Sequence, residues 1–303
     1  MPGYRNSNRP ATLQLLPLRL VRIRSVRIGF FILAAVCWAQ SGTDQALPKV
    51  AEYASGFWQS SAGFVGRETL KQKALVMPKK RIRVGGEALG AAKPELKDRE
   101  ILSFYALSSF KATPEALHEF REIVSIDGRA SAGSREKLVA TIESNDDHAK
   151  KALQGQFEKA NLTVAATDFG QLLLLFTRAN LAKYSFERRP AEMLGADRAF
   201  VFAFQHISGG EALRVTEAGK RVNEPLSGEI WVRESDFLPL RVTLKASRID
   251  QAQEIRDEAR VDYAPQGKGL VLPASVVYRR FIGTRLVVEN ICEYSDWQPV
   301  HSK

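Results

Sequence analysis

The chain has 303 residues, of which 45% are hydrophobic, 26% charged and 9% aromatic. This composition fits an ordinary globular chain and excludes collagen-like, coiled-coil and wholly disordered proteins. The 44 Lys and Arg residues exceed the 34 Asp and Glu residues, which gives a formal net charge of +10. Residues 1–39 hold six of the arginines and no acidic residue, so the rest of the chain has 38 basic and 34 acidic residues, a net charge of +4.

Residues 1–39 are predicted to be an export leader. An apolar run of 12 residues, Ile28 to Ala39, follows the arginine-rich stretch, whereas a membrane-spanning helix needs about 20. A basic segment, a short apolar segment and small residues at its end are typical of a secretory signal peptide, here with cleavage after Ala39. Two alternatives stay open: lipidation at Cys37, although Val36 stands where a small residue belongs, and retention as an anchor. Because the basic part is long, translation starting inside it is a further hypothesis.

The cysteine content agrees with export. Without the leader, Cys292 is the only cysteine, so no internal disulfide can form and a hydrophobic core must stabilise the fold. The 264 residues from 40 to 303 are enough to form one. We therefore predict a single domain over residues 40–303, with Cys292 buried in a strand, located in the periplasm or envelope of a Gram-negative-type bacterium.

The domain is predicted to begin with a polar linker, residues 40–46, and an amphipathic helix. The helix follows from apolar residues at helical spacing, namely Leu47, Val50, Ala51, Ala54, Phe57 and Trp58. We expect it to dock on the protein's own sheet; the alternative, a membrane-surface helix, would have a polar face rich in Lys and Arg, which is missing here. A strand is predicted over 64–76, and a mobile connection rich in charge and glycine over 79–99.

Strands and helices follow in turn. Strands are predicted around residues 101–107 and 118–126, and Asp127-Gly128 is a strong hairpin signal. Ser134 can cap a helix, and residues 144–147 resemble a capping box before a second helix predicted over 151–162. The next run, Gly170 to Phe176, contains four consecutive leucines and no polar side, so it is expected to be buried all round or to face an apolar partner.

From Leu181 onward the pattern has a period of two, which predicts strands. Between Ala199 and His206, the side chains of Phe200, Phe202 and Phe204 point one way and the intervening ones the other. Strand follows strand with short turns and no intervening helices, so the sheet is predicted to be antiparallel. The fold class is therefore α+β.

Several strand motifs occur in a characteristic order. They are Gly228-Glu-Ile-Trp-Val, Leu238-Pro-Leu-Arg-Val, Ala259-Arg-Val-Asp-Tyr, Leu272-Pro and Glu293-Tyr-Ser-Asp-Trp. In this order the chain resembles LolA/LolB-like proteins and the outer-membrane lipoprotein-sorting group, best over residues 180–299 and weakly before about 118. The segment 120–128 and the predicted helices after it also resemble a group of secreted proteins from soil bacteria of acidobacterial type.

The resemblance implies a strongly curved antiparallel sheet, a half-barrel, with helices over its concave side and an apolar cavity for acyl chains. No functional residue of the carriers can be placed on this chain. From the residues themselves, the leucine run and the phenylalanine face are candidates for lining one cavity, and core packing is the alternative explanation. The candidates are Leu172, Leu173, Leu174, Leu175, Phe176, Phe200, Phe202 and Phe204.

No sequence motif indicates catalysis, a metal or a cofactor. The four histidines are far apart, no G-x-S-x-G occurs, and residues 85–90 contain glycines without the Lys-Ser/Thr of a phosphate loop. The basic runs at 79–83 and 279–280 are expected to be solvated, with lipid headgroup contact at a membrane surface as the alternative. A net charge of +4 and the lack of any nucleic-acid-binding motif predict no nucleic-acid partner.

Three functional hypotheses follow. The favoured one is a non-enzymatic envelope protein that binds a lipid, lipoprotein or other amphipathic ligand in the apolar cavity. The second is an envelope scaffold or interaction module with a filled core. The third is an enzyme whose site residues are scattered along the sequence. The oligomeric state stays open.

Overall fold

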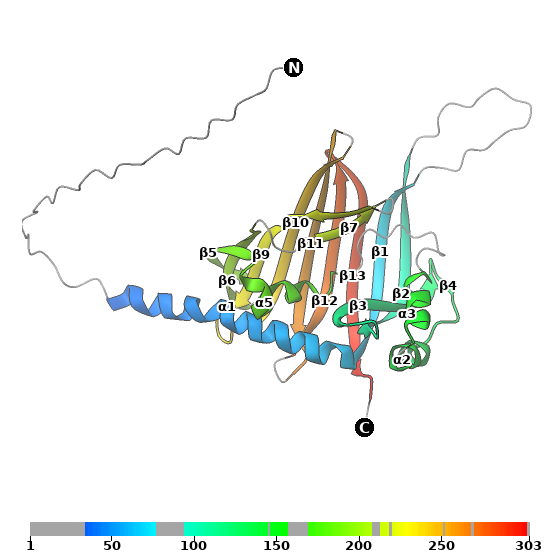
Figure 1. Ribbon diagram of the computed structural model, residues 1–303, viewed down its shortest axis with the longest axis horizontal. Helices are drawn as coiled ribbons and strands as arrows, with labels where there is room; N and C mark the ends of the chain where they lie inside the picture. Colours follow the sequence, from blue (N-terminus) through cyan, green and yellow to red (C-terminus); the bar gives the residue numbers. More distant parts are fainter. Residues whose placement is uncertain are drawn as a thin grey trace, which may run out of the picture. The chain divides into compact units, whose positions relative to one another are not determined.

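The computed structural model describes residues 34–76, 94–144, 146–156, 169–207, 213–217, 220–250, 252–267 and 270–301, of which 34–44, 115, 213–217 and 220–223 are described by their backbone alone. The chain divides into two units, Met1–Gln40 and Ser41–Lys303. Every described strand belongs to the second unit, and these strands are drawn in Figure 1.

An open antiparallel sheet forms the body of the second unit. Its eleven strands follow the order β4-β3-β2-β1-β13-β12-β11-β10-β9-β6-β5, and β7 and β8 form a separate hairpin. The strands are β1 Phe64–Val76, β2 Glu95–Phe110, β3 Thr113–Ile126, β4 Arg129–Ala130, β5 Tyr184–Leu194, β6 Asp197–His206, β7 Leu213–Glu217, β8 Lys220–Glu224, β9 Ser227–Arg233, β10 Pro239–Asp250, β11 Gln253–Pro265, β12 Val271–Ile282 and β13 Arg285–Pro299. The helices are α1 Ala34–Ser60, η1 Ser61–Gly63, α2 Arg135–Glu143, α3 Asp147–Gln154, η2 Leu172–Phe176 and α5 Arg178–Leu181. The predicted α+β class, with a curved sheet that does not close, is confirmed.

The strand registers define one continuous face, which we call the inner face; the opposite side is the outer face. Directly paired residues of antiparallel strands project to the same side of a sheet. A row of buried apolar residues, each paired with the next, crosses the inner face: Val242, Val261, Val276, Cys292, Leu70 and Ile101. The predicted burial of Cys292 in a strand is therefore confirmed.

The apolar stripe of α1 packs into the same core. Val50, Ala54 and Phe57 are buried in it, and the Phe57 ring meets the ring of Tyr263 edge-on, with centroids 6.3 Å apart. The predicted docking of this helix on the protein's own sheet is confirmed. Trp58 differs from the prediction because it is 40% exposed, so the buried stripe ends at Phe57.

The structure differs from the prediction at two connections. Residues 40–46 are helical rather than a linker, so Pro48 lies inside α1, where it removes one backbone hydrogen-bond donor from the helix. Residues 95–99 belong to β2 rather than to the predicted connection. They pair with β1, where Lys73 lies opposite Asp98, and opposite charges across a strand pair are favourable. Residues 79–93 lie outside the described part.

Helices α2 and α3 pack on the outer face, whereas α1 and η2 cover the inner one. Leu138 of α2 and Leu153 of α3 share a small core with three residues that pair across β1, β2 and β3, namely Val65, Ala106 and Phe120. The prediction that helices cover the concave side therefore holds only for α1 and η2. The structure describes the second predicted helix only to Gln154, as α3, and residues 157–168 lie outside the described part.

The predicted caps are partly confirmed. Ser134 caps α2 by accepting a hydrogen bond from the backbone N–H of Lys137 at 3.3 Å. In α3 the cap is Asp146, which accepts from the N–H of His148 at 2.8 Å, and not Ser144 as the capping box predicted. The aspartate lies next to the first helical turn, where its oxygen reaches the orphan donors directly.

The predicted hairpin at Asp127-Gly128 is confirmed. Both residues have left-handed backbone, with φ of 50° and 74°, and the turn joins β3 to β4. Two consecutive residues with positive φ make the two-residue turn whose twist matches that of the flanking strands.

Replacing Gly128 with alanine is expected to lower the free energy of unfolding by about 1 kcal/mol, because a Cβ is strained in left-handed backbone even where nothing lies within 4 Å of it. The matched control is Gly56→Ala, inside α1 and equally uncrowded, which should raise the free energy of unfolding by up to about 1 kcal/mol. Urea unfolding of both variants measures the difference. Effects of the same sign would contradict the assignment of the cost to backbone conformation.

Candidate functional site

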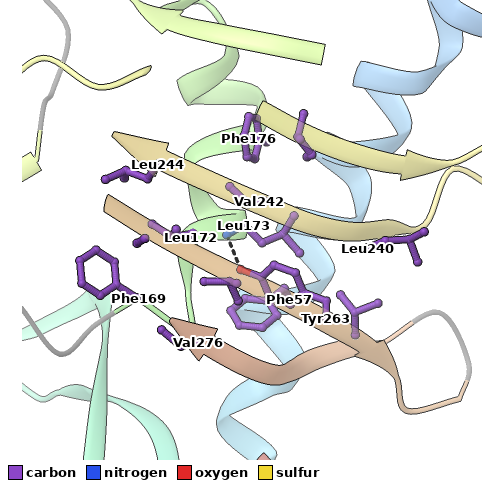
Figure 2. Close-up of a cluster of buried hydrophobic side chains, with 14 of the residues drawn as sticks. Phe57, Phe169, Leu172, Leu173, Phe176, Leu240, Val242, Leu244, Tyr263 and Val276 are labelled. Carbon is purple, nitrogen blue, oxygen red and sulfur yellow. Dashed lines mark hydrogen bonds between the residues drawn. The ribbon is translucent and has the colours of Figure 1, made fainter. Parts of the chain in front are cut away.

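The eight predicted cavity residues gather at one place on the inner face. Six of them are buried in the main core, and the other two, Leu174 and Leu175, are half-buried against it; Figure 2 shows part of the set. The Phe176 ring meets the Phe204 ring edge-on, with centroids 5.2 Å apart. The leucine run and the phenylalanine face therefore pack against each other, with side chains of the protein itself between the sheet and η2.

Residues 169–176, which we call the plug segment, lie along the inner face. A short 3-10 helix shapes them, with hydrogen bonds from Leu172 N–H to the Phe169 carbonyl and from Leu174 N–H to the Gln171 carbonyl. At the start of the segment, the Phe169 ring stacks on Tyr278, with centroids 4.9 Å apart. The segment places its leucines against β10 and β11, as Figure 2 shows.

Two side chains fasten the plug segment through its backbone. The Tyr263 hydroxyl accepts a hydrogen bond from Leu173 N–H at 2.9 Å and donates to the Gly170 carbonyl at 3.2 Å. The Glu119 carboxylate accepts from Gly170 N–H at 2.7 Å. Burial, and to a smaller extent the charge of Glu119, raises the pKa of Tyr263, so its hydroxyl stays protonated and able to donate.

Gly170 lies in a crowded position. A Cβ at this position would lie 2.7 Å from the Tyr105 hydroxyl and 2.9 Å from the carboxylate oxygen of Glu119. Real Cβ atoms do not approach other atoms so closely, so a larger residue here would displace the ends of the Tyr105 and Glu119 side chains.

Glu119 belongs to a buried charge cluster on the inner face, which we call the inner ionic cluster and which consists of Glu68, Glu119 and Arg121. The guanidinium of Arg121 donates to both oxygens of Glu68, at 2.7 and 2.9 Å, and to Glu119 at 2.5 Å. Both glutamate side chains are 0% exposed and that of Arg121 is 7% exposed. Ser103 adds a hydrogen bond to Glu68 at 2.9 Å.

The cluster strongly shapes the protonation of its surroundings. Burial by itself lowers the pKa of Arg121, but Glu68 and Glu119 outweigh it and hold the pKa well above the ordinary value. Burial, followed by the charges of the neighbouring groups, raises the pKa of Cys292 and of Tyr294. Within the described part, the cluster therefore sets two carboxylates against one permanently charged guanidinium, surrounded by protonated groups.

Sequence reasoning missed the inner ionic cluster. The prediction of a strand over residues 118–126 identified no inner side and assigned no role to Glu119 or Arg121. The register places them inward because Arg121 pairs with Tyr105 and Glu119 with Leu107. A signal was present: Glu119 and Arg121 alternate with Leu117 and Ile123 on the same side of the strand.

A second ionic cluster lies on the inner face at β10, β11 and β12. Asp257 accepts hydrogen bonds from Arg280 at 2.8 and 3.0 Å and from the Tyr278 hydroxyl at 2.6 Å. Arg248 bonds Glu224 at the end of β8 and lies 3.8 Å from Asp257. This second cluster has two carboxylates and two guanidinium groups, so the formal charges of these four groups balance. It joins β8, β10, β11 and β12 and does not indicate a ligand.

The second cluster corrects the interpretation of residues 279–280 as an exposed basic run. Only Arg279 faces water, where it pairs with Glu289 at 2.6 Å. Arg280 points to the inner face and is held by Asp257. The other basic run, 79–83, lies outside the described residues.

In the part of the chain that the structure describes, no group of three or more His, Cys, Asp and Glu residues is placed to hold a metal ion. Over the same residues, no helix combines the length and the apolar character needed to cross a membrane.

Neither a protein-family model nor a curated protein matches the sequence. Among solved structures, the chain is similar to a LolA superfamily protein from Nitrosomonas europaea, with 13% identity, a TM-score of 0.31 and coverage of 85% of this chain and 94% of that one. It is also similar to a DUF1329 family protein from Desulfovibrio piger, with 10% identity, a TM-score of 0.33 and coverage of 86% and 92%. An outer membrane lipoprotein-sorting protein domain from Vibrio parahaemolyticus follows, with 8% identity, a TM-score of 0.30 and coverage of 84% and 92%. These similarities concern the fold group that the strand motifs resemble.

Removing the cation of the inner ionic cluster is expected to be costly. Arg121→Ala leaves two buried carboxylates without their guanidinium, which should lower the free energy of unfolding by about 3–5 kcal/mol. The matched control is Arg279→Ala, whose side chain is 45% exposed in its pair with Glu289 and whose loss should cost no more than about 1 kcal/mol. Chemical unfolding of both variants is the measurement, and a cost for Arg121→Ala as small as that of the control would contradict the burial of the cluster.

Proposed function

We propose that this chain is an exported envelope protein that binds the hydrocarbon chain of a lipid, lipoprotein or other amphipathic ligand, without catalysis. In the proposal, the plug segment occupies the ligand's place, and the ligand enters when the segment moves away. The observation that carries the proposal is the make-up of this segment: from Leu172 to Phe176 it is a single short turn of apolar side chains that, together with α1, covers the inner face of an open curved sheet.

The energetics of such an exchange are balanced. Apolar surface gains about 25 cal/mol per Å2 on leaving water, whichever chain supplies it. Burial of a hydrocarbon chain would therefore recover most of the free energy that is lost when the leucines and Phe176 become exposed to water. The specific fastening of the plug segment is small by comparison, since it consists of the Tyr263 and Glu119 contacts and a hydrogen bond from Asn180 to the Leu174 carbonyl at 3.0 Å.

The second candidate function is an envelope interaction module with a permanently filled core. The burial of Leu172, Leu173 and Phe176 in the main core favours it. The two candidates differ in one measurable property, which is whether weakening the plug segment opens a binding site or only lowers stability.

The leader at residues 1–39 supports a location in the cell envelope. We propose that residues 1–39 are a cleaved signal peptide and that the mature chain lies in the periplasm or cell envelope of a Gram-negative-type bacterium, where it meets lipid or lipoprotein acyl chains and contacts membranes only peripherally. The near balance of charge after residue 39 leaves no basic field for nucleic acid.

Cleavage of the leader has a direct test. Expression of the full chain in a Gram-negative host should give a periplasmic product whose first residue is Gln40, as read by N-terminal sequencing. Ala39→Arg removes the small residue at the cleavage position and should leave the precursor uncut. A wild-type product that keeps the leader would contradict cleavage and favour an anchor.

Binding of a neutral hydrocarbon probe, diphenylhexatriene, tests the proposed function. Tyr263→Phe removes the hydroxyl that holds Leu173 and Gly170, which should lower the free energy of unfolding by about 1–2 kcal/mol. Because the plug segment competes with the ligand, the same change should tighten probe binding by up to about tenfold.

The matched control is Tyr278→Phe, which removes a buried hydroxyl bonded to Asp257 and keeps the ring on which Phe169 stacks. It should lose stability with unchanged probe affinity. Fluorescence titration and urea unfolding give the two quantities for each variant. If neither the wild type nor Tyr263→Phe shows saturable binding, the filled-core module is the better assignment.

A further inference from the structure

We propose that the ligand of this site carries an N–H donor, a primary ammonium or an amide, at the head of its hydrocarbon chain, and that Glu119 receives it. The inference rests on the proposed function, because it takes the plug segment as a stand-in for the ligand. It adds the chemical class of the headgroup and the residue that recognises it.

The plug segment shows what the site accepts. Its side chains are apolar from Leu172 to Phe176, and its first polar contact is the Gly170 N–H, which points at Glu119 from 2.7 Å. An amphiphile that replaces the segment leaves Glu119 without this donor. A buried carboxylate that loses a hydrogen bond is costly, so a ligand that supplies its own N–H is preferred over one that does not.

The charges around Glu119 select the sign of the headgroup. Arg121 turns its guanidinium to both Glu68 and Glu119, and the second oxygen of Glu119 faces the plug segment, where it accepts from Gly170 N–H. A fatty acid would place a third carboxylate beside two that are 0% exposed. Like charges at such a site repel strongly because little water screens them. An ammonium group is attracted by the same arrangement.

The space around Gly170 selects the size of the headgroup. A single added carbon there would come within 3 Å of both Tyr105 and Glu119. The position suits a primary amine or an amide nitrogen with its hydrogen toward Glu119. A quaternary ammonium has the charge but neither the hydrogen nor the small size, so its comparison with a primary ammonium measures what hydrogen bonding and size contribute together beyond charge.

Isothermal titration calorimetry of the full chain with four twelve-carbon amphiphiles, each below its micelle concentration, tests the inference. The four are dodecylammonium, dodecyltrimethylammonium, N-dodecylacetamide and dodecanoate. The dissociation constant of dodecylammonium should be lower than those of dodecanoate and dodecyltrimethylammonium by about tenfold or more, the usual range for a hydrogen bond to a charged group. N-dodecylacetamide should also bind more tightly than dodecanoate.

Glu119→Gln should reduce the preference for dodecylammonium over dodecanoate by about tenfold. Glu293→Gln is the matched control, since Glu293 lies exposed on the outer face of β13 and its loss should leave the preference unchanged. The comparison among ligands on the wild type needs no variant, so poor folding of Glu119→Gln would not prevent a decision.

The outcomes separate the inference from the function on which it rests. Dodecanoate binding as tightly as dodecylammonium would overturn the headgroup assignment and leave hydrocarbon binding intact. A preference that survives in Glu119→Gln would overturn the role of Glu119. If none of the four ligands binds to the wild type or to Tyr263→Phe, the proposed function fails and the inference with it.

Discussion

The burial of Arg121 between Glu68 and Glu119 is the interaction on which the inner face depends. Charges removed from water are tolerated only when they are paired and hydrogen-bonded, and this guanidinium satisfies both carboxylates at once. The pairing fixes the position of Glu119, and Glu119 in turn receives the backbone of Gly170. The position of the plug segment therefore depends on the ion pair between Glu68 of β1 and Arg121 of β3, which reaches across β2.

The rest of the inner face obeys a second constraint, which is that an open sheet must cover its apolar side. Here a five-residue turn, η2, supplies much of the cover, together with one face of α1. Its packing resembles a core, yet its backbone is bonded to the sheet mainly through Tyr263 and Glu119. A ligand shifts such an equilibrium only by its differential affinity for the open form, so the few polar contacts set how strong a ligand must be. In the proposed function, the hydrogen bonds of Tyr263 to the plug segment therefore tune the affinity for the ligand.

Sequence patterns predicted much of the fold and little of the polar site, and the reason is physical. The antiparallel class and the hairpin at Asp127-Gly128 follow from local rules of period and turn conformation. In β3 those rules fail to identify the inner side, because α2 and α3 cover Phe120 on one face while Glu119 and Arg121 are buried on the other. A strand covered on both sides has no solvent side to set the phase of its pattern. The apolar residues Leu117 and Ile123 on the same side as the two charges are a signal, but it can be interpreted only once the pairing of β3 with β2 and the contact of Arg121 with Glu68 are known.

The two ends of the plug segment give the site a direction. At one end Gly170 meets the inner ionic cluster, and at the other Phe176 meets the aromatic face of β6 at Phe204. The second ionic cluster does not compete for a headgroup, because Asp257 is held by Arg280 and the charges there balance. An amphiphile that replaces the plug segment therefore has one favourable orientation, with its head toward β3 and its chain toward β6. The sheet thereby provides a polar and an apolar end along a single covered face, and the orientation follows from where Glu119 faces the plug segment.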